Sequence, residues 1–186
     1  MSASDVTTQL LRTRVAPALR ELGLRGSGQH FRLVDDGGHH ALLSVVRSQA
    51  MVPGESVFTV EVAFHEGGQA WQAARAAAAW LPERPTASRL VVPSAWHERL
   101  GFLAEPPHDH WFLVQGPDDA DPVADELITL VRDVALPQLT ARVRGEVPPP
   151  VPVLPRDPGP DGAERPRVAC PSAYCTLNVY AARHGW

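Results

Sequence analysis

The sequence has no lysine, only two cysteines and no long hydrophobic run. Its 17 basic residues are all arginine and are outnumbered by 21 acidic residues, which gives a formal net charge of −4. Proteins that bind DNA or RNA need a basic surface, so this balance predicts no nucleic-acid partner. No apolar run approaches the ~18 residues that cross a bilayer. The start from Met1 to Asp5 lacks the basic and apolar blocks of a secretory leader.

These absences predict a cytoplasmic protein without membrane contact, in which Cys170 and Cys175 are reduced thiols. The heavy use of alanine, arginine and proline is typical of GC-rich bacterial coding. Hydrophobic residues make up 44% of the 186 residues, enough for one domain with a real core. Prolines crowd residues 147–166, and each one fixes φ and removes a backbone donor. We therefore predict one domain over 1–146, an extended linker over 147–166, and a weakly docked C-terminal segment over 167–186.

Alternating apolar residues predict three consecutive strands around which the chain is organised. They cover residues 30–34, 40–49 and 56–65, and a fourth strand is expected over 111–115. The third strand alternates most regularly, which indicates a sheet with one well-buried face. The apolar side of this strand consists of Phe58, Val60, Val62 and Phe64. Residues 24–29 are expected to form a glycine-bearing connection in front of the first strand.

Apolar stripes at helical spacing predict helices before and after these strands in the sequence. Ser4 or Asp5 can cap the first helix, Gly23 can end it in a left-handed conformation, and Pro17 should kink it. The middle helix is the alanine-rich stretch 69–81.

A short helix is expected over 95–103, and the last helix begins at Asp121 and Pro122. Pro137 should bend that last helix near its end. The sequence therefore predicts an α+β fold. We expect an antiparallel sheet of about four strands with N-terminal, middle and C-terminal helices packed on it, followed by the proline-rich tail.

The hairpin between the first two strands decides which polar residues share a face of the sheet. A loop of two or four residues around Asp36-Gly37-Gly38 places Arg32 and Arg47 on one face. A three-residue loop reverses this, because a slip of one residue turns every side chain over. An arginine pair suits bidentate capture of a carboxylate or phosphate. The alternative is an ordinary solvated face with an Arg–Glu pair. Under the first register the candidate ligand site contains Arg32, Arg47, Gln49 and Glu61, with His30 and His65 nearby.

A second candidate is the loop from His108 to Trp111. Two histidines at i and i+2 of a strand face the same way and can bind zinc, with His97 or Glu105 as a third ligand. No recognised metal spacing is present, so a structural reading is favoured, in which Asp109 holds the loop and Trp111 packs. A third possible zinc site consists of Cys170, Cys175 and His184. We predict that neither this site nor the histidine loop binds a metal, and that the protein has no cofactor.

No set of residues specifies a reaction. The glycines Gly26 and Gly28 follow a helix instead of opening one, so they form no phosphate loop, and there is no Gly-x-Ser-x-Gly elbow. We therefore predict a small non-catalytic binding or protein-interaction domain, with a protein or a small anionic ligand as its partner. One alternative is an enzyme or metal-binding protein that uses the loop from His108 to Trp111. Another is an accessory or toxin-neutralising protein that blocks a partner's surface.

Several short motifs, taken in their order, resemble a bacterial family of unknown function, DUF4304, over residues 5–142. A helix that ends in Leu22-Gly23-Leu24 runs into a strand with Phe31-Arg32. The later motifs that resemble the family are Arg47-Ser48-Gln49, Phe58-Thr59-Val60-Glu61-Val62, Arg99-Leu100-Gly101, Asp109-His110-Trp111-Phe112 and Ala135-Leu136-Pro137-Gln138-Leu139. The resemblance implies a type of fold and no activity, since a fold by itself does not define a function.

Overall fold

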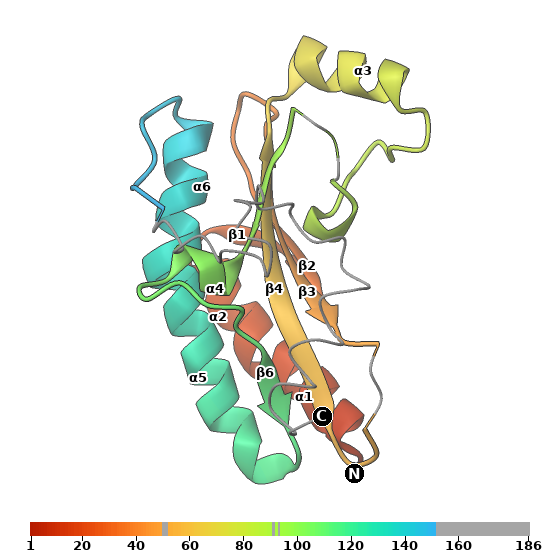
Figure 1. Cartoon of the computed structure of the whole chain (residues 1–186), viewed down its shortest axis with the longest axis vertical. Helices are drawn as coiled ribbons and strands as arrows, with labels where there is room; N and C mark the ends of the chain where they lie inside the picture. Colours follow the sequence, from red (N-terminus) through yellow and green to blue (C-terminus); the bar gives the residue numbers. More distant parts are fainter. Residues whose placement is uncertain (50–51, 91, 93, 152–186) are drawn as a thin grey trace, which may run out of the picture.

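The computed structural model describes residues 1–49, 52–90, 92 and 94–151 (Figure 1). This part of the chain combines an antiparallel sheet of six strands with helices, which confirms the predicted α+β fold. The sheet has the order β1-β2-β3-β4-β5, and β6 pairs with the same edge of β4 as β5 does. The strands are β1 (Leu24–Ser27), β2 (His30–Leu33), β3 (His40–Arg47), β4 (Ser56–His65), β5 (Trp96–Arg99) and β6 (Phe112–Val114).

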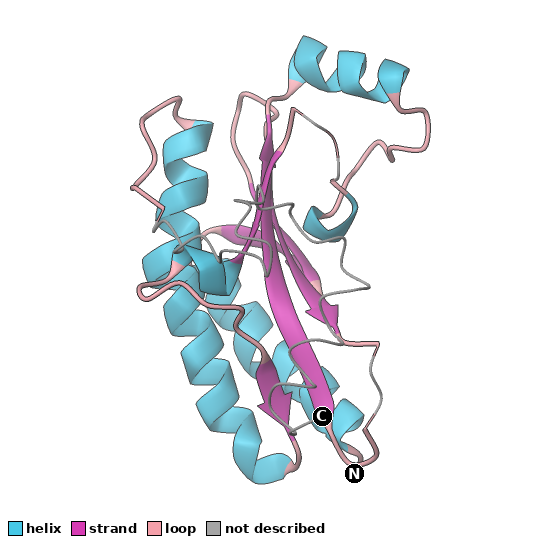
Figure 2. Ribbon diagram, in the orientation of Figure 1, coloured by secondary structure: helices cyan, strands magenta, loops and turns pink. Residues whose placement is uncertain are grey.

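Helices from both ends of the chain lie on one face of the sheet, here termed the helix-covered face (Figure 2). They are α1 (Ala3–Leu10), α2 (Ala16–Glu21), α5 (Ala120–Leu130) and α6 (Leu136–Val143). The opposite face is covered by the middle of the chain, with α3 (Gly68–Ala77) and the 3-10 turn η2 (Ala87–Arg89). Two short pieces remain, α4 (Leu100–Leu103) and the 3-10 turn η3 (Pro117–Asp119). In the described residues we find no helix with the length and hydrophobicity to span a bilayer.

The main core lies between β4 and the helices. Phe58, Val60 and Val62 have no exposed surface, and the ring of Phe58 stacks on Phe112 of β6 with centroids 5.0 Å apart. Strand β4 has the predicted bounds, and its even-numbered side faces the core as predicted. The period of two in the sequence sufficed here because the same face stays buried along the whole strand.

A second, smaller core lies on the opposite face of the sheet. Leu42 of β3 and Ala63 of β4 pack there against Trp71 of α3 and against residues of the chain that follows it. The buried members from that chain are Leu81, Ala87 and Leu90. This face is therefore only partly solvated, although its strands carry many polar residues.

Both long helical segments pass through a proline without ending. In each of them a π-helical turn, Leu11–Val15 or Val131–Ala135, lies directly before the α-helix that contains the proline. The N–H of Ala16 bonds the carbonyl of Leu11, and the N–H of Leu136 bonds that of Val131. The wider turn accommodates a proline ring that would otherwise clash with the preceding turn. The expected distortion at Pro17 and Pro137 is therefore a π turn.

Several local expectations were wrong. Residues 24–27 form β1 and pair with β2, because Gly26, with φ +151°, brings its backbone against His30 and Phe31 where no side chain would fit. Residues 96–99 form β5 instead of starting a helix, since they find an open edge of β4. Ser2, not Ser4 or Asp5, caps α1, and the Asp5 carboxylate accepts the N–H of Ser2 in return. Gly23 does follow α2 with φ +90°, as predicted.

The start of α5 also differs from the expectation. The helix begins at Ala120 with Asp119 at the N-cap position, and the Asp119 carboxylate accepts the N–H groups of Gln115 and Gly116 upstream instead of capping α5. Of the predicted linker, residues 147–151 are described, and they contain no helix or strand. There Pro149 accepts a bond from Gln138 of α6. The rest of the linker and the segment 167–186, with Cys170 and Cys175, lie outside the described residues.

Candidate functional site

The structure separates the arginines of the first candidate site. Arg32 of β2 lies opposite Leu42, and Arg47 of β3 lies opposite Phe58, so the two point to opposite faces of the sheet. The predicted register is wrong because Leu33 pairs with Ala41, so an odd number of residues, 34–40, connects the paired positions and reverses the parity of a two- or four-residue loop. The carboxylate of Asp35 accepts the N–H groups of Gly37 and His39, both at 3.0 Å, and builds a wider turn.

The remaining residues of that site have separate surroundings. Arg47 reaches α1, where its two terminal nitrogens bond the hydroxyls of Ser4 and Thr8 at 2.7 Å. Gln49 follows the end of β3 and is exposed. Glu61 does share the face of Arg32, but it is 4% exposed and faces His97 of β5 at 3.6 Å. The structure therefore does not bring the four predicted residues together.

A buried polar cluster joins β4, β5 and the loop before β6. Arg99 of β5 lies beside Glu61 in the ladder and donates two bonds to Asp109, at 2.8 and 2.9 Å. Its guanidinium also lies 5.0 Å from the ring centre of Trp111, a distance suited to a cation–π contact. Asp109 thus holds the loop and Trp111 packs, as their structural interpretation predicts.

Gly101 has a packing role beside this cluster. A side chain there would collide with His108 and His110, because the loop lies directly on α4 and His108 donates its N–H to the Gly101 carbonyl at 3.0 Å. The Arg-Leu-Gly and Asp-x-Trp motifs therefore meet in space as one structural unit. This geometry ties three segments together and leaves Asp109 fully engaged with Arg99.

The two histidines of the loop do lie side by side. Nε2 of His108 is 2.9 Å from Nδ1 of His110, a hydrogen bond between the rings. Nε2 of His110 also lies 3.3 Å from Glu126 of α5. Among residues 1–49, 52–90, 92 and 94–151, no group of three or more His, Cys, Asp or Glu side chains is placed to hold a metal ion.

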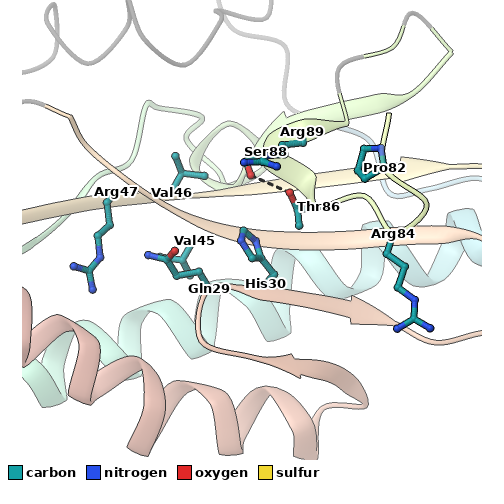
Figure 3. A pocket seen from close by; sticks show the side chains of 10 residues that line it. All are labelled: Gln29, His30, Val45, Val46, Arg47, Pro82, Arg84, Thr86, Ser88 and Arg89. Carbon is teal, nitrogen blue, oxygen red and sulfur yellow. Dashed lines mark hydrogen bonds between the residues drawn. The ribbon is translucent and has the colours of Figure 1, made fainter. Parts of the chain in front are cut away.

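An open cleft of about 450 Å³ lies where β2 begins beside β3, roofed by the chain after α3 (Figure 3). Its ends are marked by Arg47 and Arg84, and His30, Thr86 and Ser88 lie between them. Among the described residues that line it, none is acidic. The lining residues are Gln29, His30, Val45, Val46, Arg47, Pro82, Arg84, Thr86, Ser88 and Arg89. We term the sheet face that carries His30, Ser44 and Glu61 the cleft face.

The electrostatics of the cleft are one-sided. The side chains of Arg84 and Arg89 are exposed, and neither guanidinium group makes an ion pair or hydrogen bond with another described residue. Partial burial, and then the charge of Arg89, lowers the pKa of His30 from its ordinary value, so the ring is mostly neutral at pH 7. Unpaired guanidinium groups beside hydroxyls form a cleft that can accept an anion.

One buried hydroxyl fixes the geometry of the cleft. The side chain of Ser44 has no exposed surface. Its Oγ accepts the N–H of Ala87 at 3.0 Å and lies 3.0 Å from Nδ1 of His30. Ser44 thereby joins the floor of the cleft, on β3, to its roof at η2 and to the histidine at its centre.

Sequence reasoning missed most of this site. Arg84, Thr86, Ser88 and Arg89 lie in a proline-containing stretch that was expected only to be irregular. The sequence contained one possible signal for this site. Arg84 and Arg89 lie five residues apart in a segment whose apolar residues have neither helical nor strand periodicity. Nothing in that spacing shows that the segment folds back over β3, because the contact is set by tertiary structure.

Comparison with known proteins places the chain in a family. The family described as Domain of unknown function (DUF4304) matches residues 15–141, well over half of the sequence. No curated protein and no solved structure matches the chain. The chain belongs to the DUF4304 family, as its motifs suggested, and this membership assigns it no activity.

Proposed function

We propose that this domain is a non-catalytic binding module that takes an anionic group, carried by a small molecule or by a protein partner, into the cleft. The observation that supports the proposal is the lining of the cleft, where three arginines and a histidine occur without any acidic residue among the described lining residues. The chain as a whole has a net charge of −4, so the positive charge of the cleft is opposite in sign to the net charge of the protein.

The arginines have different tasks in this proposal. Arg84 and Arg89 are available for bidentate contacts with an anion, since no described residue pairs with them. Arg47 lines one end of the cleft, but its guanidinium lies on the helix-covered face, where Ser4 and Thr8 occupy its terminal nitrogens, so it is not available for a direct contact with the anion. A positive field of this kind also steers anions toward the cleft in a salt-dependent manner.

A protein partner and a small ligand share this chemistry. The cleft is open to solvent, so it can take a free anion or an anionic side chain presented by another protein. The other roles considered above, in catalysis, metal binding or neutralisation of a toxin, have no comparable set of unpaired groups among the described residues.

Calorimetric titration with inorganic phosphate, sulfate and pyrophosphate tests the proposal. We expect saturable binding that weakens as the salt concentration rises. The double variant Arg84→Ala/Arg89→Ala should bind at least ~10-fold more weakly, because each charge-assisted bond contributes about 1.5–3 kcal/mol. The matched control is Arg12→Ala/Arg75→Ala, which removes two exposed arginines outside the cleft. Equal loss in both double variants would show only a non-specific effect of charge and would contradict the proposal.

A further inference from the structure

The centre of the cleft offers hydrogen-bond donors from two separate parts of the chain. His30 comes from β2, and Thr86, Ser88 and Arg89 come from the segment above it (Figure 3). Oγ1 of Thr86 and Oγ of Ser88 are 3.2 Å apart, so one hydroxyl donates to the other. The accepting hydroxyl keeps its own proton and can donate it into the cleft.

The bond between Ser44 and His30 permits two charge states of the histidine. When the ring is neutral, the Ser44 hydroxyl, which already accepts from Ala87, can donate to Nδ1, and the proton of His30 is then on Nε2. When the ring is charged, Nδ1–H donates to the second lone pair of the same oxygen. In both states Nε2–H is the donor left over, since no described residue bonds it. His30 can therefore gain a proton without losing its anchor.

We propose that the anion bound at this centre is a phosphoryl dianion and that its binding is coupled to the uptake of one proton by His30. This inference rests on the proposed anion-binding function and assigns to it a ligand class and a pH dependence. A phosphoryl group has three strong acceptor oxygens that point in different directions. These oxygens suit donors that converge from β2 and from residues 86–89. A planar carboxylate has two acceptor oxygens, which a single guanidinium already satisfies.

The charges around His30 agree in sign with this coupling. Arg89 faces it from η2, Arg84 and Arg47 lie at the two ends of the cleft, and Arg32 shares its strand and sheet face. The nearest carboxylate of the sheet, Glu61, lies two strands away from His30, on β4, and faces His97 and Arg99 of β5. Partial burial, and then the charge of Arg89, lower the pKa of His30 when the cleft is empty. A bound dianion offsets the positive charge around the ring, favours the protonated histidine and so raises that pKa.

Sulfate allows this proton to be assigned to the protein, because sulfate is a dianion that does not titrate near neutral pH. We would measure sulfate binding by calorimetry in two buffers of different ionisation enthalpy, from about pH 8 to about pH 5.5. The wild type should take up about half a proton per sulfate at the pH of greatest uptake and bind up to ~10-fold more tightly at the lower pH, as expected for a pKa raised by about one unit.

The variant His30→Asn keeps a side-chain nitrogen or oxygen within reach of Ser44 but cannot titrate. It should bind sulfate with no proton uptake and with a flat pH profile. The matched control His108→Asn changes an exposed histidine outside the cleft and should behave like the wild type. If proton uptake persists in His30→Asn, another group titrates and our assignment of the proton is overturned.

Ligand class is tested at pH 7 with inorganic phosphate, phenyl phosphate and benzoate. We expect both phosphates to bind at least ~10-fold more tightly than benzoate, and the comparison of the first two distinguishes a free from an esterified phosphoryl group. Benzoate binding as tightly as phenyl phosphate would overturn the ligand class. Binding of sulfate and phosphate without any proton uptake would overturn the coupling and leave the anion-binding function intact. Failure of every anion to bind would instead remove the proposed function itself.

Discussion

The two faces of the sheet are built on different principles. The helix-covered face is apolar along the whole of β4 and packs against four helices. The cleft face has only a small apolar core near Trp71, and next to it lie a buried ion pair and a basic cleft. Apolar burial is the main source of stability, whereas unpaired charges at a surface serve recognition. The comparison therefore assigns stability mainly to the helix-covered face, and the binding that we propose would use the other.

The largest difference should appear when the same charge is introduced on each face. Val60→Asp places a carboxylate in the main core, where Val60 has no exposed surface, and should prevent folding. Val46→Asp introduces it at the half-exposed edge of the cleft and should leave the domain folded. Circular dichroism and gel filtration distinguish the two results. A soluble Val60→Asp variant that unfolds cooperatively would contradict the division between the faces.

Truncating an aromatic ring in the main core should have the next largest effect. Phe58→Ala removes a ring without exposed surface that stacks on Phe112, and it should lower the free energy of unfolding by about 3–5 kcal/mol. Urea denaturation measures this loss. A loss below about 1 kcal/mol would show that the main core can repack and that the helix-covered face is not the principal source of stability.

Breaking the buried ion pair tests whether the cleft face also contributes to stability. Asp109→Ala leaves the guanidinium of Arg99 buried without its partner and should cost about 3 kcal/mol in urea denaturation. The matched control is Asp133→Asn in the exposed pair Arg132–Asp133, which should leave the denaturation midpoint unchanged. Equal denaturation midpoints for both variants would mean that the Arg99–Asp109 pair does not contribute to the stability of the fold.

A pH effect of intermediate size on stability should originate from His40, at the start of β3 on the cleft face. Burial, and then the neighbouring His65 and Arg32, lower the pKa of His40 from 6.5 to about 4. Between these values the unfolded chain binds more protons than the folded one, so stability present above pH 6.5 is lost as the pH falls toward about 4. The loss should be on the order of 1 kcal/mol, because solvent screens the half-exposed ring.

Urea denaturation across this pH range measures the effect of His40. The variant His40→Gln should show a shallower decline of stability than the wild type, whereas His108→Gln should retain the full decline. His40 packs edge-on against Trp71 with ring centres 4.4 Å apart. The protonation of His40 therefore acts on the contact that holds α3 to the sheet. A decline that is identical in all three proteins would assign the pH dependence to other groups.

The smallest effect on stability should come from the arginines of the cleft. Arg84→Ala/Arg89→Ala should leave the denaturation midpoint unchanged, because both side chains are exposed and no described residue pairs with them. The same variant is expected to lose anion binding. A clear fall in stability would show that the cleft arginines belong to the fold, and the contrast between the two faces would disappear.

Part of this architecture follows from the sequence alone. The bounds and buried side of β4 came from its alternation, and the end of the first helical segment came from Gly23. Local steric preferences and the alternation of apolar and polar residues determine such features, so neighbours along the chain are enough to predict them. The structural role of Asp109 also followed from its place in a recognisable motif.

The functional geometry was decided by tertiary structure. The turn built by Asp35 changed the parity of the β2–β3 pairing and sent Arg32 and Arg47 to opposite faces. Strands β1 and β5 exist because a neighbouring edge was free, which no local pattern reports. The cleft requires residues 82–89 to fold over β3, where Ser44 bonds Ala87 across 43 positions of sequence. Pairing between distant segments depends on the whole fold, and the periodicity of either segment contains no information about it.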